Sequence, residues 1–532
     1  MSKKFFLFVM SCFIVVPLVL TSCKAAPVEE KKPAEEKPKV EKEGPRGMAT
    51  YAPSTGTMSY RSAIDPHTGV GAEQTTINCL LFDGLLTKDE KGNEVPALAK
   101  SWEIAPDWSY IDFFMQEGVK FHNGEACTAE DVKFSIERAG REDLMFVFGY
   151  EVRENVDRVE VLDDYHVRVY VTKPYPALFD RAYNNLMIVP KDYIEKVGDK
   201  GFAANPVGAG PFKIIDFKHD EYVFCEAVVD HYRKTPYVEK FRFVICEEPA
   251  TRLAMLKTGE ADFIMIPGTD IPEVDRDPNL TRIQSEYTFL VTMVFQDLAF
   301  PDEPSPLHDP RVRRACSLAI DREGICREIL NGAGEPWGTF LAPYNAGYEY
   351  MEPDPYDLER AKELLAEAGY PNGFDTTFTC GSGDKWWMEP IAAQLNEAGI
   401  RAEFVVLEHG IWQKEHTLGE LHGLSYGSGP WWACRAHPAV ALDSHTRGGW
   451  APVGRTFPEF DAAFQKIVTA TSEEAIAKTA KEYNQILLDS TFRVPLWSVN
   501  AQYAVGPRVE SYEPVPGLIF PIRMEYLKLK DE

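Results

Sequence analysis

The second half of the chain alternates between helical and strand-like hydrophobic patterns. Apolar residues recur at helical spacing over residues 358–368, and Gly369 follows as a helix stop. Phe374–Cys380 then alternates as a strand, Pro390–Ala398 has the pattern of a helix, and Ile400–Leu407 that of another strand. Strand, helix and strand in this order form a βαβ unit, which predicts a partly parallel sheet in an α/β fold.

Two further helix starts are marked by capping residues. One helix is expected to open at Asp309, with Pro310 at its first position. The other follows a short strand at Val119–Phe121 and an Asn-Gly turn at 123–124, and its N-cap is Thr128. The apolar face of the first helix is expected to contain Val312, Ala315, Cys316, Ala319 and Ile320.

The N-terminus has the pattern of an export signal. Lys3 and Lys4 precede the apolar stretch Phe5–Leu20, which is shorter than the roughly 20 apolar residues of a membrane span. The stretch ends in Leu-Thr-Ser-Cys, which matches the bacterial lipobox. We therefore expect residues 1–22 to be a lipoprotein signal peptide and Cys23 to become the lipidated first residue.

Composition changes sharply after this signal. Residues 24–46 alternate Lys, Glu, Pro and Ala without any aromatic residue, which is typical of a solvated tether. Charges in this tether nearly cancel, so the formal net charge of −26 belongs to the folded part. Nucleic-acid binding is not expected, because phosphate recognition needs clustered Lys and Arg.

Cysteine usage gives no redox or zinc motif. Ten cysteines are present, and eight remain after the signal and the lipidation site are set aside, without a CxxC pair among them. Buried free thiols are the favoured interpretation. Cys225 and Cys246 could pair only if the strands Tyr222–Ala227 and Phe241–Cys246 are adjacent, which the sequence leaves open.

Motifs for catalysis are also missing. There is no phosphate-binding GxxxxGK[ST] and no HExxH, and Gly427-Ser428-Gly429 is too short for a nucleophile elbow. His409, His416 and His422 are scattered with Glu residues on a polar segment, without the spacing of a metal site. No enzyme activity, cofactor or metal is therefore expected.

Aromatic residues gather in the Gly- and Pro-rich segment 426–450, which is therefore interpreted as a loop; rings of this kind often line concave sites. A second aromatic pair follows the strand Phe374–Cys380, where ligands of open α/β sheets lie. The candidate solute-contacting residues from both segments are Trp386, Trp387, Tyr426, Trp431 and Trp432. Asn205 and Tyr60 are added from the first half of the chain.

Several segments together resemble one family. Gly118–Ser135, with its Gly-Val-Lys-Phe-His-Asn-Gly run followed by Thr-Ala-Glu-Asp-Val, is the most specific. The others are Leu81–Leu86, Pro96–Trp102, Asn205–Phe212 and Asp309–Arg322. In order and content they are similar to the family 5 solute-binding proteins of ABC importers, the peptide- and nickel-binding group.

The resemblance implies a two-lobed periplasmic-binding-protein fold of type II, with an extra subdomain in the first lobe. A folded part of about 485 residues is also too long for one hydrophobic core. The expected divisions are a signal peptide at 1–22, a lipid anchor and tether at 23–46, a first lobe at 47–296 with its subdomain at about 81–200, a second lobe at 297–494, and a return segment of the first lobe at 495–532.

The segment Trp431–Pro438 resembles the family's Trp-x-Ala-Asp element. In peptide-binding members the Asp pairs with the ligand's α-amino group, but this chain has Cys434 at that position and Arg435 beside it. A thiol cannot supply the countercharge of a buried ammonium, whereas a guanidinium suits a carboxylate, sulfonate or phosphate. Cys434 and Arg435 therefore join the candidate site, and an anionic or neutral solute is expected.

The resemblance implies a lipid-anchored periplasmic or cell-surface receptor, monomeric by the family's habit, which passes a small solute to ABC permease subunits. One alternative is an oligopeptide or dipeptide receptor in which Asp443 or Glu408 pairs with the amine. Another is a metal-chelate carrier using His409, His416 and His422. A secreted hydrolase is the third, and the missing nucleophile motifs disfavour it.

Overall fold

The computed structural model describes residues 44–53, 64–68, 72–144, 146, 149–176, 186–219, 221–285, 289–430, 437–439, 441–442, 457–515 and 523–531. Gly44–Glu532 forms one compact unit. The expected signal peptide and the lipidation site Cys23 therefore lie outside the described residues. Across the described ranges, none of the helices combines the length and apolar character that a membrane crossing requires.

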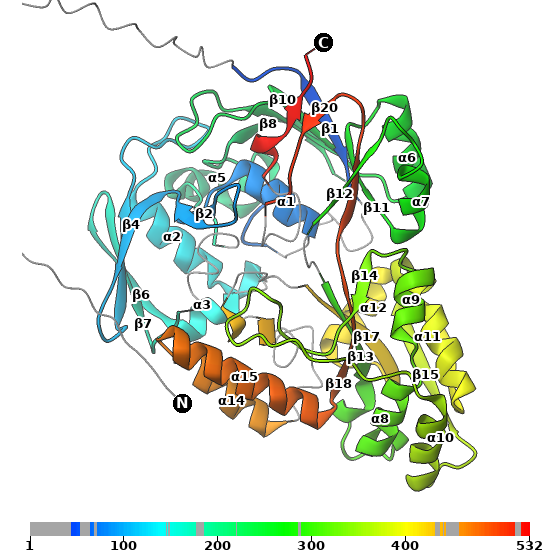
Figure 1. The fold of residues 1–532 in the computed structure, drawn as a ribbon. Helices are drawn as coiled ribbons and strands as arrows, with labels where there is room; N and C mark the ends of the chain where they lie inside the picture. Colours follow the sequence, from blue (N-terminus) through cyan, green and yellow to red (C-terminus); the bar gives the residue numbers. More distant parts are fainter. Residues whose placement is uncertain are drawn as a thin grey trace, which may run out of the picture. The chain divides into compact units, whose positions relative to one another are not determined.

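A seven-stranded mixed sheet forms one half of the compact unit (Figure 1). In spatial order its strands are β12 (Thr281–Gln284), β19 (Gln502–Val505), β11 (Phe263–Ile266), β1 (Met48–Ala52), β10 (Lys240–Val244), β9 (Tyr222–Ala227) and β8 (Phe212–Lys218). Strand β1 is parallel to both of its neighbours. The helices that pack on this sheet are α1 (Ala72–Leu81), α6 (Pro249–Thr258) and α7 (Ile271–Val274). The first strand of the chain is thus central to this sheet.

A six-stranded sheet forms the other half (Figure 1). In spatial order its strands are β14 (Gly334–Pro336), β18 (Arg493–Val499), β13 (Phe289–Phe295), β17 (Leu424–Pro430), β15 (Phe374–Gly381) and β16 (Ile400–Leu407). The helices of this half are α8 (Pro310–Leu318), α9 (Arg322–Glu328), α10 (Leu358–Glu367), α11 (Lys385–Glu397), α12 (His409–Leu418), α14 (Pro458–Val468) and α15 (Glu473–Ser490). Strand β15 is parallel to β16 and β17, which confirms the predicted βαβ unit.

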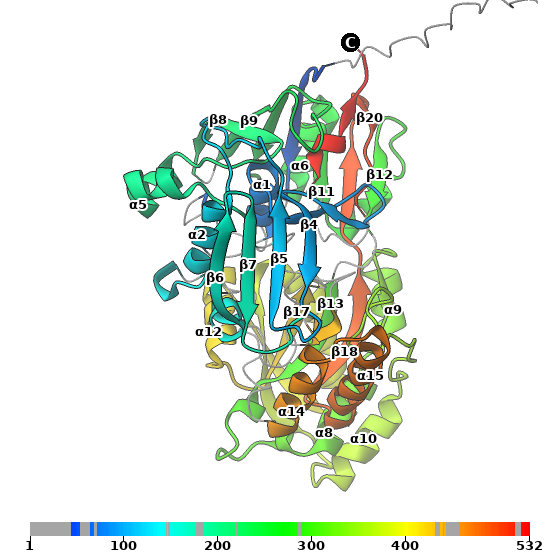
Figure 2. The same cartoon turned by 90° about the vertical axis from the view of Figure 1, so that its left-hand side faces the viewer.

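A separate four-stranded antiparallel sheet lies within residues 81–200 (Figure 2). Its order is β4 (Ala99–Ile104), β5 (Tyr110–Met115), β7 (His166–Val171) and β6 (Val156–Asp163), and helices α2 (Ala129–Ala139) and α3 (Gly149–Asn155) pack on it. Helix α5 (Lys191–Ala204) follows. Two short antiparallel pairs, β2 (Leu86–Lys88) with β3 (Glu94–Pro96) and β20 (Val509–Ser511) with β21 (Lys528–Leu529), complete the sheets.

The chain passes between the two large sheets twice. Strand β12 ends in the first sheet and β13 begins in the second, while β18 ends in the second and β19 begins in the first. The two passages are joined, because the backbone N–H of Ser285 donates to the carbonyl of Ala501 at 3.0 Å. The expected lobe boundary 296/297 falls just after β13, and 494/495 falls inside β18, and both of these strands belong to the six-stranded sheet. The lobe division stays a prediction.

Capping predictions are confirmed at both helices. The carboxylate of Asp309 accepts from the backbone N–H of Arg311 at 2.8 Å, at the start of α8. Thr128 precedes α2, and its backbone N–H donates to the Asp131 carboxylate at 2.8 Å. The predicted strand Val119–Phe121 is wrong, since only Lys120 makes an isolated bridge, with Ala126.

Two boundaries near the candidate site differ from the prediction. Helix α11 starts at Lys385, five residues before the expected start, so Trp386 and Trp387 lie on a helix rather than a loop. Residues 426–430 form the end of β17 rather than a loop. The reason is tertiary, because β17 pairs with β13 along its whole length and overrides a composition of Gly, Ser and Pro.

The seven described cysteines are free thiols. Six are buried, as predicted, and Cys246 is half-buried. Strands β9 and β10 are adjacent, but Cys225 faces Phe241 in the register, and Cys246 lies beyond the end of β10. Cys434 lies outside the described residues.

Candidate functional site

The candidate site lies at the carboxyl end of β15, beside the first half of the parallel strand β17. Strand β15 ends at Gly381, and the short turn Ser382–Asp384 leads directly into α11. In open α/β sheets this edge is where ligands lie. Of the predicted residues, the structure brings together Trp386, Trp387 and Tyr426 here.

Asp384 connects the helix to the strand. Its carboxylate accepts a hydrogen bond from Nε1 of Trp387 at 2.9 Å and another from the hydroxyl of Tyr426. Tyr426 is 1% exposed, and burial together with the Asp384 carboxylate raises its pKa well above the usual value. The phenol therefore stays protonated and acts as a donor. The sequence offered one signal for Asp384, an acidic residue two positions before an aromatic pair, and the prediction missed it.

Aromatic rings surround this carboxylate. The ring of Trp412, on α12, stacks on Tyr426 at 4.6 Å with an interplanar angle of 5°. Trp387 lies 6.1 Å from Tyr426 and 6.1 Å from Trp497. Trp387 is 8% exposed, whereas its neighbour Trp386, with the ring 6.0 Å away, is 37% exposed. The cluster is thus a fixed aromatic wall with one ring open to solvent.

The other predicted residues are placed elsewhere or not described. Asn205 follows α5 as its C-cap, and its carbonyl accepts from the Tyr193 hydroxyl at 3.0 Å. Five candidates lie outside the described residues: Tyr60, Trp431, Trp432, Cys434 and Arg435. Their contact with a solute stays a prediction.

The residues of the alternative readings take local roles. Glu408 caps α12, accepting from the backbone N–H of Ile411 at 3.1 Å, and Asp443 lies outside the described residues. His416 is 1% exposed and shares a hydrogen bond of 2.9 Å with Nε2 of Gln296.

His422 stacks its ring on Phe300 at 4.2 Å, and its Nδ1 lies 3.5 Å from Asp297. His416 instead stacks on Trp412. Within the part of the chain that the structure describes, no three His, Cys, Asp or Glu residues are grouped to hold a metal ion. His416 and His422 therefore act as packing residues with local polar partners. The side chain of His409 lies outside the described part of the structure.

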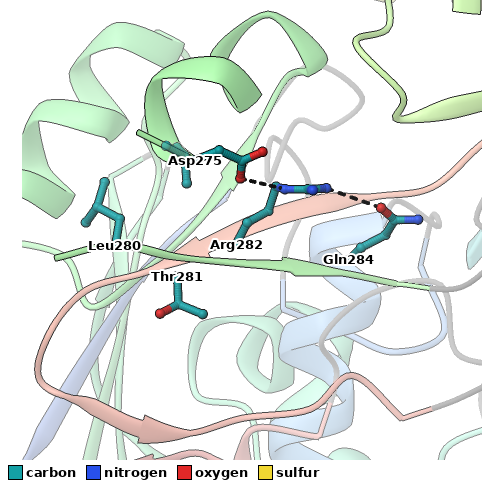
Figure 3. Close-up of a pocket in the computed structure, with 6 residues that line it drawn as sticks. Asp275, Leu280, Thr281, Arg282 and Gln284 are labelled. Carbon is teal, nitrogen blue, oxygen red and sulfur yellow. Dashed lines mark hydrogen bonds and ion pairs between the residues drawn. The ribbon is translucent and has the colours of Figure 1, made fainter. Parts of the chain in front are cut away.

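A separate pocket of about 430 Å³ opens between α7 and β12 (Figure 3). It is lined by Val274, Asp275, Leu280, Thr281, Arg282 and Gln284. Arg282 crosses it, with Nε 2.9 Å from Asp275 and Nη1 3.3 Å from Gln284 and 3.0 Å from Gln502 (Figure 3). Sequence patterns gave no signal for this pocket. The Arg282 to Gln502 bond joins β12 to β19 beside the passages between the sheets.

Solved structures share this fold. The periplasmic binding protein DppA from Helicobacter pylori, in complex with the peptide STSA, has a TM-score of 0.81 at 24% identity, covering 91% of this chain and 98% of that one. NikZ from Campylobacter jejuni, in complex with Ni(L-His), has a TM-score of 0.77 at 20% identity, covering 91% and 100%. The fold is thus the two-lobed, mixed α/β fold of type II periplasmic binding proteins, as predicted.

Sequence comparison gives the family. The sequence-family model for bacterial extracellular solute-binding proteins, family 5 middle, matches residues 93–446. The chain therefore belongs to this family. Heme-binding protein A of Haemophilus influenzae is 27% identical over 455 residues, 79% of this chain and 82% of the relative. The glutathione-binding protein GsiB of Pectobacterium atrosepticum is 26% identical over 357 residues, 66% and 68%. The family expectation from the motifs is confirmed.

Proposed function

We propose that this protein is an extracytoplasmic substrate-binding lipoprotein of an ABC importer, which holds a small solute between two lobes and delivers it to the permease. Family membership carries the proposal. Two large sheets between which the chain passes at 285–288 and 500–501 support it, because short passages of this kind allow the halves to rotate about them. A solute that contacts both halves would stabilise the closed state, which the permease would recognise.

The solute class is proposed from local chemistry. Relatives are named for binding heme and glutathione, and structural neighbours were solved with a peptide and with agropinic acid, so family membership alone does not select a solute. We infer an anionic or aromatic solute for two reasons. Arg435 lies next to Cys434, which stands at the position of the amine-pairing acid, and the ring of Trp386 is partly open to solvent beside the site. Free-amine peptides lose their usual countercharge at Cys434.

A thermal-shift screen tests this proposal. Dipeptides, aromatic carboxylates, sugars and metal chelates are added to the purified mature protein, and a ligand at 100 Kd should stabilise it by about 2.7 kcal/mol. Arg435→Met should weaken an anionic ligand by roughly tenfold to a hundredfold, since a charged hydrogen bond contributes about 1.5–3 kcal/mol. Cys434→Asp should weaken it as well. Unchanged affinity in Arg435→Met, measured by calorimetry, would exclude Arg435 from the site.

The peptide alternative has its own signature. If another acid pairs with the ligand's amine, an unmodified dipeptide should bind tightly and its N-acetylated form should not, because acetylation removes the charge. Asp443→Asn and Glu408→Gln would then identify the acid. Binding of the acetylated and free forms with equal affinity would contradict this alternative.

Membrane attachment through Cys23 is part of the proposal. The lipobox Leu-Thr-Ser-Cys supports it, and a diacyl anchor holds a protein to a membrane where one chain alone binds only marginally. Cys23→Ser should move the protein from the membrane fraction to the soluble fraction. Detection of residues 5–20 in the mature protein by mass spectrometry would contradict both lipidation and cleavage.

A further inference from the structure

A polar contact joins the four-stranded sheet to a helix of the six-stranded half. Lys173 lies just after β7, and its Nζ donates to Oε1 of Gln465 on α14 at 3.1 Å, across 292 positions of sequence. Figure 1 shows α14 and α15 beside the lower ends of β6 and β7. The subdomain within residues 81–200 therefore contacts the half of the molecule that contains the six-stranded sheet.

Buried residues lie close in sequence to both partners. Tyr175 follows Lys173 by two positions, is 4% exposed, and donates its hydroxyl to Oε2 of Glu151 on α3. Phe460 on α14 is fully buried. Tyr175 and Phe460 belong to one continuous apolar cluster. The Lys173 to Gln465 bond thus lies beside elements whose neighbouring side chains are buried, while Gln465 itself is exposed.

The two partners are attached to different sheets. Strand β7 is paired between β5 and β6, so Lys173 follows the four-stranded sheet. Helix α14 packs on α15, which packs on β18, so Gln465 follows the six-stranded sheet. The halves are linked elsewhere by the two chain passages, which the Ser285 to Ala501 hydrogen bond joins. They are also linked by Nδ2 of Asn331, which donates to the carbonyl of Gly268 at 3.1 Å. A rotation about those passages that carries the four-stranded sheet with the first large sheet would lengthen or break the Lys173 to Gln465 bond.

We propose that Lys173 and Gln465 form a latch that holds the subdomain against the second half in the closed arrangement and so sets the ratio of closed to open molecules. This rests on the proposed function only in assuming that the halves move. The subdomain then has a role in closure beyond supporting the first lobe. Both partners are near the surface, so the effect is modest, in the range of exposed polar and ionic pairs.

Single-molecule energy transfer on the solute-free mature protein tests the latch. Dyes are attached through unnatural amino acids at Lys196 on α5 and Glu363 on α10, which leaves the native thiols unmodified. Gln465→Glu turns the hydrogen bond into an ion pair and should raise the closed-to-open ratio about two- to fivefold at low salt, with loss of the gain at high salt. Lys173→Gln should lower the ratio.

The double variant gives the decisive comparison. In a Lys173→Gln background, Gln465→Glu should lose its effect, because the new carboxylate has no cation to meet. Lys200→Gln, at an exposed position on α5, is the matched control and should leave the ratio unchanged. An equal effect of Gln465→Glu in both backgrounds, no effect in either, or a single population in every variant would overturn the latch. Since no solute is added, a failed solute screen leaves this result intact.

Discussion

Asp384 shows how a single side chain can organise the aromatic wall at the end of β15. It precedes α11, and its carboxylate holds Trp387 on the helix and Tyr426 on the strand. The aromatic residues were predictable from composition, since rings cluster where ligands bind. Their common partner was not, because sequence does not show that positions 384 and 426 meet across two parallel strands.

Removal of the Tyr426 hydroxyl should destabilise the protein. Tyr426→Phe keeps the ring stack with Trp412 but removes one donor to the Asp384 carboxylate, and hydrogen bonds to charged groups contribute about 1.5–3 kcal/mol. Urea unfolding measures the loss. Tyr193→Phe is the control, because its hydroxyl donates only to a neutral carbonyl, that of Asn205, and should cost about 0.5–1.5 kcal/mol or less. Equal losses in the two variants would contradict a charge-assisted bond at Asp384.

His67 should make stability depend on pH. It is fully buried, its Nε2–H donates to the carbonyl of Met187, and its Nδ1 accepts from Arg138. Burial, with the Arg138 charge beside it, lowers its pKa from 6.5 to about 4. Between about pH 4 and 6.5, the unfolded chain therefore binds a proton at His67 that the folded protein does not bind. The contribution of neutral His67 to the free energy of unfolding is fully present above pH 6.5 and is lost as the pH falls toward 4.

Urea titrations from pH 4.5 to 7 measure this contribution. His67→Gln should remove up to about 1.4 kcal/mol of pH dependence per pH unit in that window. Exposed His219→Gln is the control and should follow the wild type. The same pH profile in His67→Gln as in the wild type would contradict a neutral buried imidazole.

Elements were predictable where local signals and tertiary contacts agree. Ile400–Leu407 is β16 as predicted, because its alternating pattern matches an edge strand with one covered face. Strand β17 was missed at Tyr426, since Gly427 to Pro430 has a loop composition and only pairing with β13 makes it a strand. Helix α11 begins five residues before the predicted start at Pro390, and Pro390 lies inside the helix, where proline is ordinarily disfavoured.

The junction of β15 and β16 should tolerate no side chain at Gly373. This glycine has φ of +72°, and a Cβ there would overlap the carbonyl oxygen of Gly399, whose segment begins β16. Gly373→Ala combines left-handed strain of about 1–2 kcal/mol with overpacking of about 1–3 kcal/mol. Gly118→Ala, at φ +79° with open space around it, should show the strain alone. Denaturant unfolding that gave both variants the same loss would contradict the close approach.

At the scale of the whole molecule, the family motifs predicted features of the chain's path that hydrophobic patterns could not predict. Patterning gave an α/β fold and one βαβ unit, whereas the return of the C-terminal segment to the first sheet came from the resemblance alone. Strand β19 pairs with β11 and β12, which are more than 200 positions away in sequence. Pairings of such long range depend on the assembled fold, since no local period records which strands become neighbours.

The compact unit should fold without the residues before it. Gly44–Glu532 forms one unit by its own contacts, so a chain starting at Gly44 should keep the unfolding midpoint of the mature protein. A chain starting at residue 53 should not fold, because it lacks β1, which pairs with β10 on one side and β11 on the other in the middle of the seven-stranded sheet. Calorimetry and circular dichroism measure both. A midpoint that falls by several degrees in the chain starting at Gly44 would mean that residues 23–43 of the mature protein contribute to the stability of the fold. Cooperative unfolding of the chain starting at residue 53 would mean that β1 is dispensable to the sheet.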